Sequence, residues 1–475
     1  MLADALRARP PGLDEAFALV DGLDDALVHG LARLDDDRAA ALDALVGAFS
    51  ATPLADRVTE AIGKIISGTV TDEHLAVLAG CRLALLGAAH DALLTDLDAA
   101  LTRTREPHPA APAPAGGAAG SMASAGGGQL SAGSRSWLRE LAIAGWRGVD
   151  HELAAGGSPA VQALLGEPSR RRLAVLLDGF AAELRAAAPV ATLPRVPVRR
   201  WADLWSRALI LAQAGRPAEP GSPVDGRPAG SGTLVDGRLL ILGADLHEHP
   251  TVFRCQVHGL LETAGGVRLV RTSVAAAKVD TISGAAAWRM LSAFPILLAG
   301  LAEHRCLEVA RMTLTAGGDL IWDETRASAG EPADPFVSAR VLLAGAVATS
   351  TAPLDRHPSV IAEPVLLEGY TATAEAFDLG GGTVAVETDR LPAAGPLTPE
   401  LVAGSTACIG LLRFDGGRWA VQPIAVRSTV RKKAVTAHTG DWALGPTDAK
   451  AAKTEAVAGT AVDVLRERAG RLLRK

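Results

Sequence analysis

The chain has 475 residues, of which 48% are hydrophobic, 4% are aromatic and one is tyrosine. This length predicts more than one domain, with cores built mainly from Ala, Val and Leu. The net charge of −6 gives no electrostatic support for nucleic-acid binding, which requires a basic face.

The cysteines and the hydropathy pattern indicate an intracellular protein. None of the four cysteines belongs to a CxxC pair, and they are spread through the chain: Cys81, Cys255, Cys306 and Cys408. This pattern is typical of reduced thiols in a cytosol. Because there is no signal-peptide pattern and no unbroken apolar run of about 18 residues, we expect no membrane span and a cytoplasmic location. The abundance of alanine and arginine is typical of a GC-rich bacterial genome.

The first part of the chain predicts a helical module on a tether. In residues 1–105, apolar side chains recur at three- and four-residue steps among many carboxylates, which predicts an acidic helical module. Residues 106–135 consist largely of Pro, Ala, Gly and Ser, and they predict a flexible linker. We therefore expect the acidic module to move relative to the rest of the chain.

A second helical module is predicted over residues 136–214, followed by a linker over residues 215–231. The clearest helical pattern is "RRWADLWSRALILAQAG", in which Trp201 and Trp205 lie on one apolar face. Two tryptophans on one face predict either an anchor for a partner protein or a surface that packs on the following domain. Both interpretations remain open at the level of the sequence.

Residues 232–446 predict a large antiparallel β-domain, either a barrel or a sandwich of hairpins. Five short segments join alternating or β-branched runs, and each contains an Asp-Gly or Gly-Gly pair: "VDGR", "TAGGVR", "TAGGDL", "LGGGTV" and "FDGGRW". Such pairs accept the positive φ of tight turns, so they predict about five hairpins. One helix is expected at about residues 281–304, where Pro295 should kink or divide it. An Ala-rich helix is expected over residues 447–475. The predicted fold class is therefore α+β and multidomain, with a helical N-terminal half.

The segment "FDLGGGTVAV" has two interpretations. Asp378, Gly380, Gly381, Gly382 and Thr383 resemble the phosphate loop of the actin and Hsp70-type ATPases. That resemblance implies a nucleotide held by backbone N–H groups, with Asp378 near the metal. The family's companion motifs are missing, and the residues on both sides alternate as in strands. We therefore favour a hairpin in which Asp378 is exposed.

The segment "HEHPTVFRCQVH" contains candidate zinc ligands, namely His247, His249 and His258. In a strand, Cys255 and His258 would face opposite sides, so they would not share one ion without a bulge. His247 and His249 lie on the same face and form a candidate half-site. Exposed histidines at the start of a strand are the simpler interpretation, and no other cofactor is predicted.

The densest basic run is "VRSTVRKKAVTAH", which contains Arg427, Arg431, Lys432 and Lys433. These cations predict either a binding surface for an acidic partner, including the acidic module of the same or another copy, or an edge strand protected from aggregation by its charges.

No catalytic template fits the sequence. There is no Gly-x-Ser-x-Gly elbow and no Walker A loop, and Asp323 and Glu324 are strand neighbours that face opposite ways. We therefore expect a non-catalytic assembly or adaptor subunit that binds another protein or itself. The first alternative is an enzyme, such as a metal-dependent hydrolase, with His247, His249, His258, Asp323 or Glu324 in its site. The second alternative is a nucleotide-binding protein that uses the Asp378–Thr383 loop.

Overall fold

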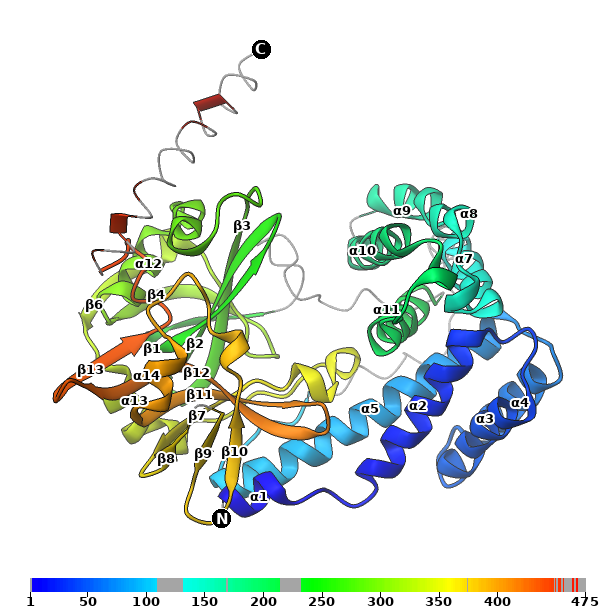
Figure 1. Cartoon of the computed structure of the whole chain (residues 1–475), viewed down its shortest axis with the longest axis horizontal. Coiled ribbons are helices and arrows are strands. Elements are labelled where there is room, and N and C mark those ends of the chain that lie inside the picture. The colour runs from blue at the N-terminus through cyan, green and yellow to red at the C-terminus, as the bar shows by residue number, and fades with distance from the viewer. Residues whose placement is uncertain are drawn as a thin grey trace.

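The computed structural model describes residues 2–108, 131–167, 170–213, 232–373 and 375–447, with isolated residues beyond 447. The fold is α+β: a helical N-terminal half precedes a β-rich C-terminal half, as predicted (Figure 1). Most of the two predicted linkers and of the predicted C-terminal helix lies outside the described residues.

The helical region extends from α1 to α11. Its elements are α1 (Leu2–Arg7), α2 (Leu13–His29), α3 (Asp36–Phe49), α4 (Ala55–Ile66), α5 (Asp72–Leu101), α7 (Ala132–Ala144), η1 (Trp146–Gly148), α8 (His151–Ala155), α9 (Ser158–Leu165), α10 (Arg171–Ala187), η3 (Val190–Thr192) and α11 (Val198–Leu211). Several helices begin at side-chain caps: Asp35 accepts a hydrogen bond from the Arg38 amide, and Thr71 accepts one from the His74 amide.

The two predicted helical modules share one hydrophobic core. That core joins Leu27 of α2 and Leu78 of α5 to Trp146 and Trp205 from beyond the predicted linker. A core of this kind needs all its helices together, because each helix buries only one face. The first module is therefore packed against the second rather than tethered to it.

Helix α5 connects the helical region to the β-region (Figure 1). Its first half places Leu75 and Leu78 in the helical core, and its second half places Leu93 and Leu97 in a core shared with the β-strands. In the described part of the chain, α5 is also the one helix long and apolar enough to cross a membrane. The two cores account for those apolar residues, as expected for the central helix of a globular protein.

The β-region contains two sheets. The first has the strand order β3-β2-β1-β4-β5, with β6 beside β4, and the second has the order β7-β11-β12-β10-β9-β8, with β13 beside β12. The strands are β1 (Thr233–His249), β2 (Val252–Thr263), β3 (Gly266–Ala277), β4 (Arg305–Leu314), β5 (Leu320–Ile321), β6 (Ala327–Pro332), β7 (Glu363–Glu368), β8 (Thr371–Ala372), β9 (Ala376–Asp378), β10 (Thr383–Val386), β11 (Ser405–Asp415), β12 (Arg418–Val430) and β13 (Lys433–His438). Among the described strands, the pairs are antiparallel except β10 with β12.

The two sheets face each other, and helices cover their outer faces. Leu242 of β1 and Leu260 of β2 meet Ile409 and Ile424 of the second sheet in one cluster. The outer face of the first sheet packs on η4 (Gly284–Leu291) and α12 (Pro295–Ala302). The outer face of the second sheet packs on α1 and on the end of α5. The β-region is therefore a sandwich between helical layers.

Shorter elements complete the β-region. They are η5 (Glu324–Arg326), α13 (Pro335–Leu342), η6 (Leu343–Gly345), η7 (Pro353–Asp355), η8 (Pro358–Val360), η9 (Thr388–Arg390) and α14 (Pro399–Ala403). Pro295 is the first residue of α12 and divides the predicted inserted helix, as expected.

Four of the five predicted glycine turns are confirmed. They join β2 to β3, β4 to β5, β9 to β10 and β11 to β12. The prediction for "VDGR" is wrong, because β1 runs straight through it with a bulge between Val235 and Gly237. A side chain at Gly237 would place its Cβ 2.3 Å from the Glu262 carbonyl oxygen. The glycine there allows a close backbone approach and not a turn.

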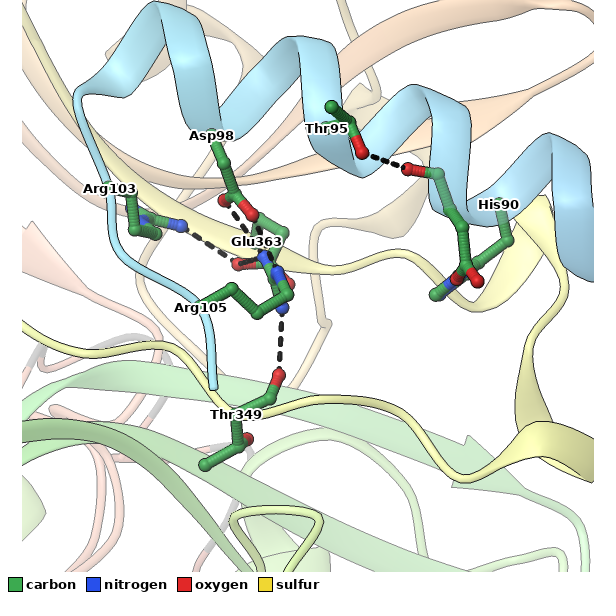
Figure 2. Close-up of polar contacts among 8 residues, drawn as sticks. His90, Thr95, Asp98, Arg103, Arg105, Thr349 and Glu363 are labelled. Carbon is green, nitrogen blue, oxygen red and sulfur yellow. Dashed lines mark hydrogen bonds and ion pairs between the residues drawn. The ribbon is translucent and has the colours of Figure 1, made fainter. Parts of the chain in front are cut away.

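Buried ion pairs attach the end of α5 to β7 (Figure 2). Arg103 donates to a carboxylate oxygen of Glu363 at 2.8 Å, and Arg105 lies 3.2 Å from the same oxygen. Arg105 also pairs with Asp98 at 2.7 Å and donates to the Thr349 carbonyl oxygen at 2.8 Å. Burial alone would raise the pKa of Glu363, but the charges of Arg105 and Arg103 outweigh it and lower the pKa.

Candidate partner-binding site

The β12–β13 hairpin carries the predicted basic run. Val430 pairs with Lys433 across a two-residue turn formed by Arg431 and Lys432. Both turn residues have left-handed backbone, with φ of +50° and +66°. Two-residue hairpin turns of this kind strongly favour Asn-Gly, because other L-residues are strained at positive φ. The tip therefore holds two cations where the backbone favours a different pair of residues.

The three basic residues at the tip are exposed. Within the described ranges, Arg431, Lys432 and Lys433 form no ion pair. The hairpin lies on the side of the β-region away from the helical region (Figure 1). Because neighbouring carboxylates do not neutralise these charges, the tip presents a local positive field to solvent.

Arg427 has a different role from the tip residues. Its guanidinium donates to Asp334 at 2.6 Å and lies 4.4 Å above the ring of Phe336. Asp334 also caps the start of α13 by accepting from the amides of Phe336 and Val337. Arg427 therefore fixes the hairpin to α13, and the predicted basic run divides into one anchor and three free cations.

A small cavity lies at the base of the same hairpin. It is lined by backbone and side chains of β1, α12, β4, α13 and β13, including His304 and His438, and it encloses about 10 Å³. That volume is close to the minimum for one water molecule. The Nε2 atom of His304 lies 3.2 Å from a carboxylate oxygen of Asp441, and the rings of His304 and His438 are 4.3 Å apart. Burial lowers the pKa of His438 to about 4, so it is neutral at pH 7.

The backbone around this cavity is unusual in two places. His304 has φ of +51° and follows the C-cap of α12, a position where glycine is favoured. The β1–β2 ladder also changes register between Ile241 and Gly243, and both residues line the cavity. Bulges and strained residues are common beside functional sites. No local motif marks this group in the sequence, because His304 and His438 are distant in the chain.

The predicted zinc ligands are not brought together. His258 pairs with Gly243 and His247 pairs with Arg254, so the two histidines are separated by four positions of β1, or roughly 13 Å. His249 is exposed and contacts Thr251. In the described part of the chain, no group of three His, Cys, Asp or Glu side chains could hold a metal ion.

His247 and His258 lie instead near a buried polar network between the sheets. Asp245 accepts hydrogen bonds from Arg413 at 2.7 Å and from Gln422 at 2.8 Å, and it lies 2.9 Å from His247 Nε2. Burial alone would raise the pKa of Asp245, but the hydrogen bond from His247 and the charges of His247 and Arg413 hold it well below its usual range. Arg413 and Gln422 also bond to each other, so the polar groups of this network are paired among themselves, which indicates a structural role.

Trp201 and Trp205 lie in the helical core, with 1% and 0% of their surface exposed. The indole of Trp205 donates to the Leu138 carbonyl oxygen at 2.9 Å, and Trp201 packs edge-on against Trp146 at 6.2 Å. The tryptophan face is therefore turned inward. It is not available to an external partner, and it packs within the helical region rather than on the following domain.

Asp323 and Glu324 stabilise local backbone. Asp323 caps η5 by accepting from the Thr325 amide, and Glu324 accepts from the Trp322 indole at 2.7 Å and from the Ile296 amide. Their carboxylates are used in these contacts and do not form an acid–base pair.

The glycine loop is a hairpin turn. Thr383 pairs with Asp378, and the Leu379 amide donates to the Gly382 carbonyl oxygen at 2.9 Å. Asp378 is exposed and accepts from the Gly380 amide at 2.9 Å. A Cβ at Gly382 would lie 2.9 Å from the Arg7 side chain, so α1 closes over the loop. The prediction of a hairpin with an exposed Asp378 is confirmed.

Comparisons with known protein families, with curated proteins and with solved structures find no match to this chain.

Proposed function

We propose that this chain is a non-catalytic assembly or adaptor subunit of a cytosolic complex, and that the tip of the β12–β13 hairpin binds another protein. The observation that carries the proposal is the pair Arg431 and Lys432, two exposed cations in left-handed backbone. Each such residue costs about 1–2 kcal/mol relative to glycine. A sequence that keeps two cations at this cost is better explained by a function of their charge than by stability.

The test uses a double variant, Arg431→Asn with Lys432→Gly. Asn-Gly is the preferred pair for this turn, so the variant should be more stable than the natural chain by about 1–2 kcal/mol. It should at the same time lose the partner recovered when the natural chain is isolated from its own cells. An increase in thermal midpoint together with loss of the partner would separate a role in binding from a role in folding.

A matched control keeps the charge and the strain. In the variant Arg431→Lys with Lys432→Arg, the tip remains equally basic, so the partner should be retained. If Asn-Gly leaves the recovered partner unchanged, the hairpin tip is not the binding site. Substitution of Trp201 or Trp205 is not a useful test, because either change would open the helical core.

An enzyme remains the second candidate function, and the Asp441–His304 pair favours it. The two side chains lie 3.2 Å apart without a hydrogen bond, beside a water-sized cavity, and a carboxylate–imidazole pair that closes to a hydrogen bond can act as a general base. A hydrolase of this kind should act on simple ester or phosphate-ester substrates and lose that activity in His304→Gln, while partner recovery is unchanged. If the natural chain hydrolyses none of these substrates, this candidate is rejected for those substrate classes.

A further inference from the structure

Strand β13 is an open edge of the second sheet. Within the described ranges it pairs with β12 alone. The amide of His438 donates to the Asp441 carboxylate at 2.9 Å, so this N–H points away from β12. Amides of an antiparallel strand alternate between its two sides. The amides of Thr436 and Ala434 therefore point outward as well.

The open part of this edge is short and exposed. Ala434 and Thr436 are both exposed. At the end of β13 away from the tip, the outward amide of His438 already donates to the Asp441 carboxylate. The near end begins at the basic tip. The edge thus offers outward backbone groups at two alternate residues, beside three exposed cations. This arrangement can pair with a strand whose own residues near the tip are acidic.

We propose that β13 accepts an extended acidic segment of another protein as an added strand. This inference rests on the proposed function and names the class of partner and its mode of binding. Main-chain hydrogen bonds to Ala434 and Thr436 hold the segment, and its carboxylates meet Arg431, Lys432 and Lys433. Charge complementarity selects the partner, since the same cations repel basic strands.

Two other occupants fit less well. A second copy would add a β13 strand without carboxylates: in a parallel pair the two basic tips would repel each other, and in an antiparallel pair residues 433–438 of the second copy offer the tip no acidic side chain. The excess of acidic over basic residues in this chain lies in residues 1–105, which contain 17 Asp and Glu against 9 Lys and Arg. That region is helical and packed in its own core, so it does not supply an extended strand.

The experiment measures binding of a synthetic probe to the full-length chain. The probe is a capped hexapeptide of alternating Val and Glu, and its affinity is followed by fluorescence anisotropy at low salt. Thr436→Pro removes one outward amide and leaves the ladder with β12 intact, so it should weaken binding by about tenfold. Thr436→Ala keeps the amide and should bind like the natural chain.

A second measurement does not depend on how the proline variant folds. A probe with methylated amides on alternate residues keeps its charge but loses one row of hydrogen bonds, so it should bind at least about tenfold more weakly. Hydrogen exchange in residues 433–438 should slow when the unmodified probe is bound. If the probe does not bind at millimolar concentration, or if methylation and Thr436→Pro have no effect, the inference is overturned.

The outcomes distinguish this inference from the proposed function. If Asn-Gly at the tip abolishes partner recovery but Thr436→Pro does not, the adaptor role stands and strand addition fails. Anionic vesicles and a DNA oligonucleotide are the alternative ligands. If they bind more tightly than the probe and their affinity is unchanged by Thr436→Pro, the tip recognises anionic surfaces and the inference is again overturned. Self-association blocked by Thr436→Pro would identify a second copy as the occupant and would reject the acidic partner.

Discussion

Among single residues, Asp245 links the two sheets through a buried ion pair. It is 4% exposed and bonds to Arg413 and Gln422 of the opposite sheet. Removing one member of a buried ion pair leaves an uncompensated charge, which costs about 3–5 kcal/mol. We therefore expect Asp245→Asn to lower the free energy of unfolding by about that amount, as measured by the shift of the urea midpoint.

Two control variants give this prediction its specificity. His247 contacts the same carboxylate from a half-exposed position, so His247→Ala should cost less than about 1 kcal/mol. Joint replacement of Asp245 by Leu and Arg413 by Met removes both charges and should recover most of the loss. If Asp245→Asn costs no more than His247→Ala, the network does not hold the sheets together.

Residue positions show why the sequence revealed only part of the candidate site. The basic run at residues 427–433 is visible because its charges are contiguous. The sequence did not distinguish Arg427 from the tip, since the contacts of Arg427 with Asp334 and Phe336 join segments far apart in the chain. The histidine cavity was missed for the same reason: it forms where the turn after α12 meets the end of β13, at the contact between the rings of His304 and His438. Local patterns identify charges and turns, and only packing identifies neighbours.

At the scale of the element, the turns separate what local chemistry decides from what it does not. Gly-Gly pairs predicted four hairpins correctly because positive φ is a local requirement. The hairpin predicted at Asp236-Gly237 is absent, because the glycine there makes room for the backbone of the neighbouring strand β2. The β12–β13 turn contains no glycine, so the sequence did not predict it. Arg431 and Lys432 adopt a positive φ that residues with a side chain disfavour.

Helix α5 spans both cores and has a glycine, Gly87, near its middle. Gly87 lies between the half that packs in the helical core and the half that packs on β-strands. Gly87→Ala should raise stability by about 0.5–1 kcal/mol, since its Cβ would sit 3.7 Å from Arg356, an ordinary contact. Gly87→Pro should cost about 3 kcal/mol or more and kink the helix.

The proline variant should also uncouple the two cores. Because one continuous helix contributes to both, we expect the natural chain to unfold in a single calorimetric transition and Gly87→Pro to unfold in two. The alanine variant is the matched control and should keep one transition at a higher temperature. One shifted transition in Gly87→Pro would show that contacts other than α5 couple the two regions.

At the scale of the whole molecule, the helical and β-rich halves were predicted, but their arrangement was not. The sequence predicts a flexible tether over residues 106–135, yet residues at its start bond to the β-region. Arg105 donates to the Thr349 carbonyl oxygen, and the Glu106 amide donates to the Ala348 carbonyl oxygen. Composition identifies segments that bury little surface. It does not show that the helices on either side share one core.

Buried histidines make the stability of the whole molecule depend on pH. Burial lowers the pKa of His258, His357 and His438 to about 4, against about 6.5 in an unfolded chain. As the pH falls below 6.5, the unfolded chain binds protons that the folded chain excludes. The stability present above pH 6.5 is therefore lost progressively towards pH 4, by roughly 1–3 kcal/mol for each histidine.

The histidines dominate between pH 6.5 and about 5.5, because the carboxyl groups of the unfolded chain begin to bind protons only below about pH 5. Urea denaturation across this window should show the free energy of unfolding decreasing with falling pH. Burial also lowers the pKa of His90, so His258 is one of four proton-excluding histidines, and His258→Asn should make that slope shallower by about a quarter. His249 is exposed, so His249→Asn should leave the slope unchanged. A free energy of unfolding that stays constant from pH 7 to pH 4.5 would mean that these histidines are protonated in the folded chain.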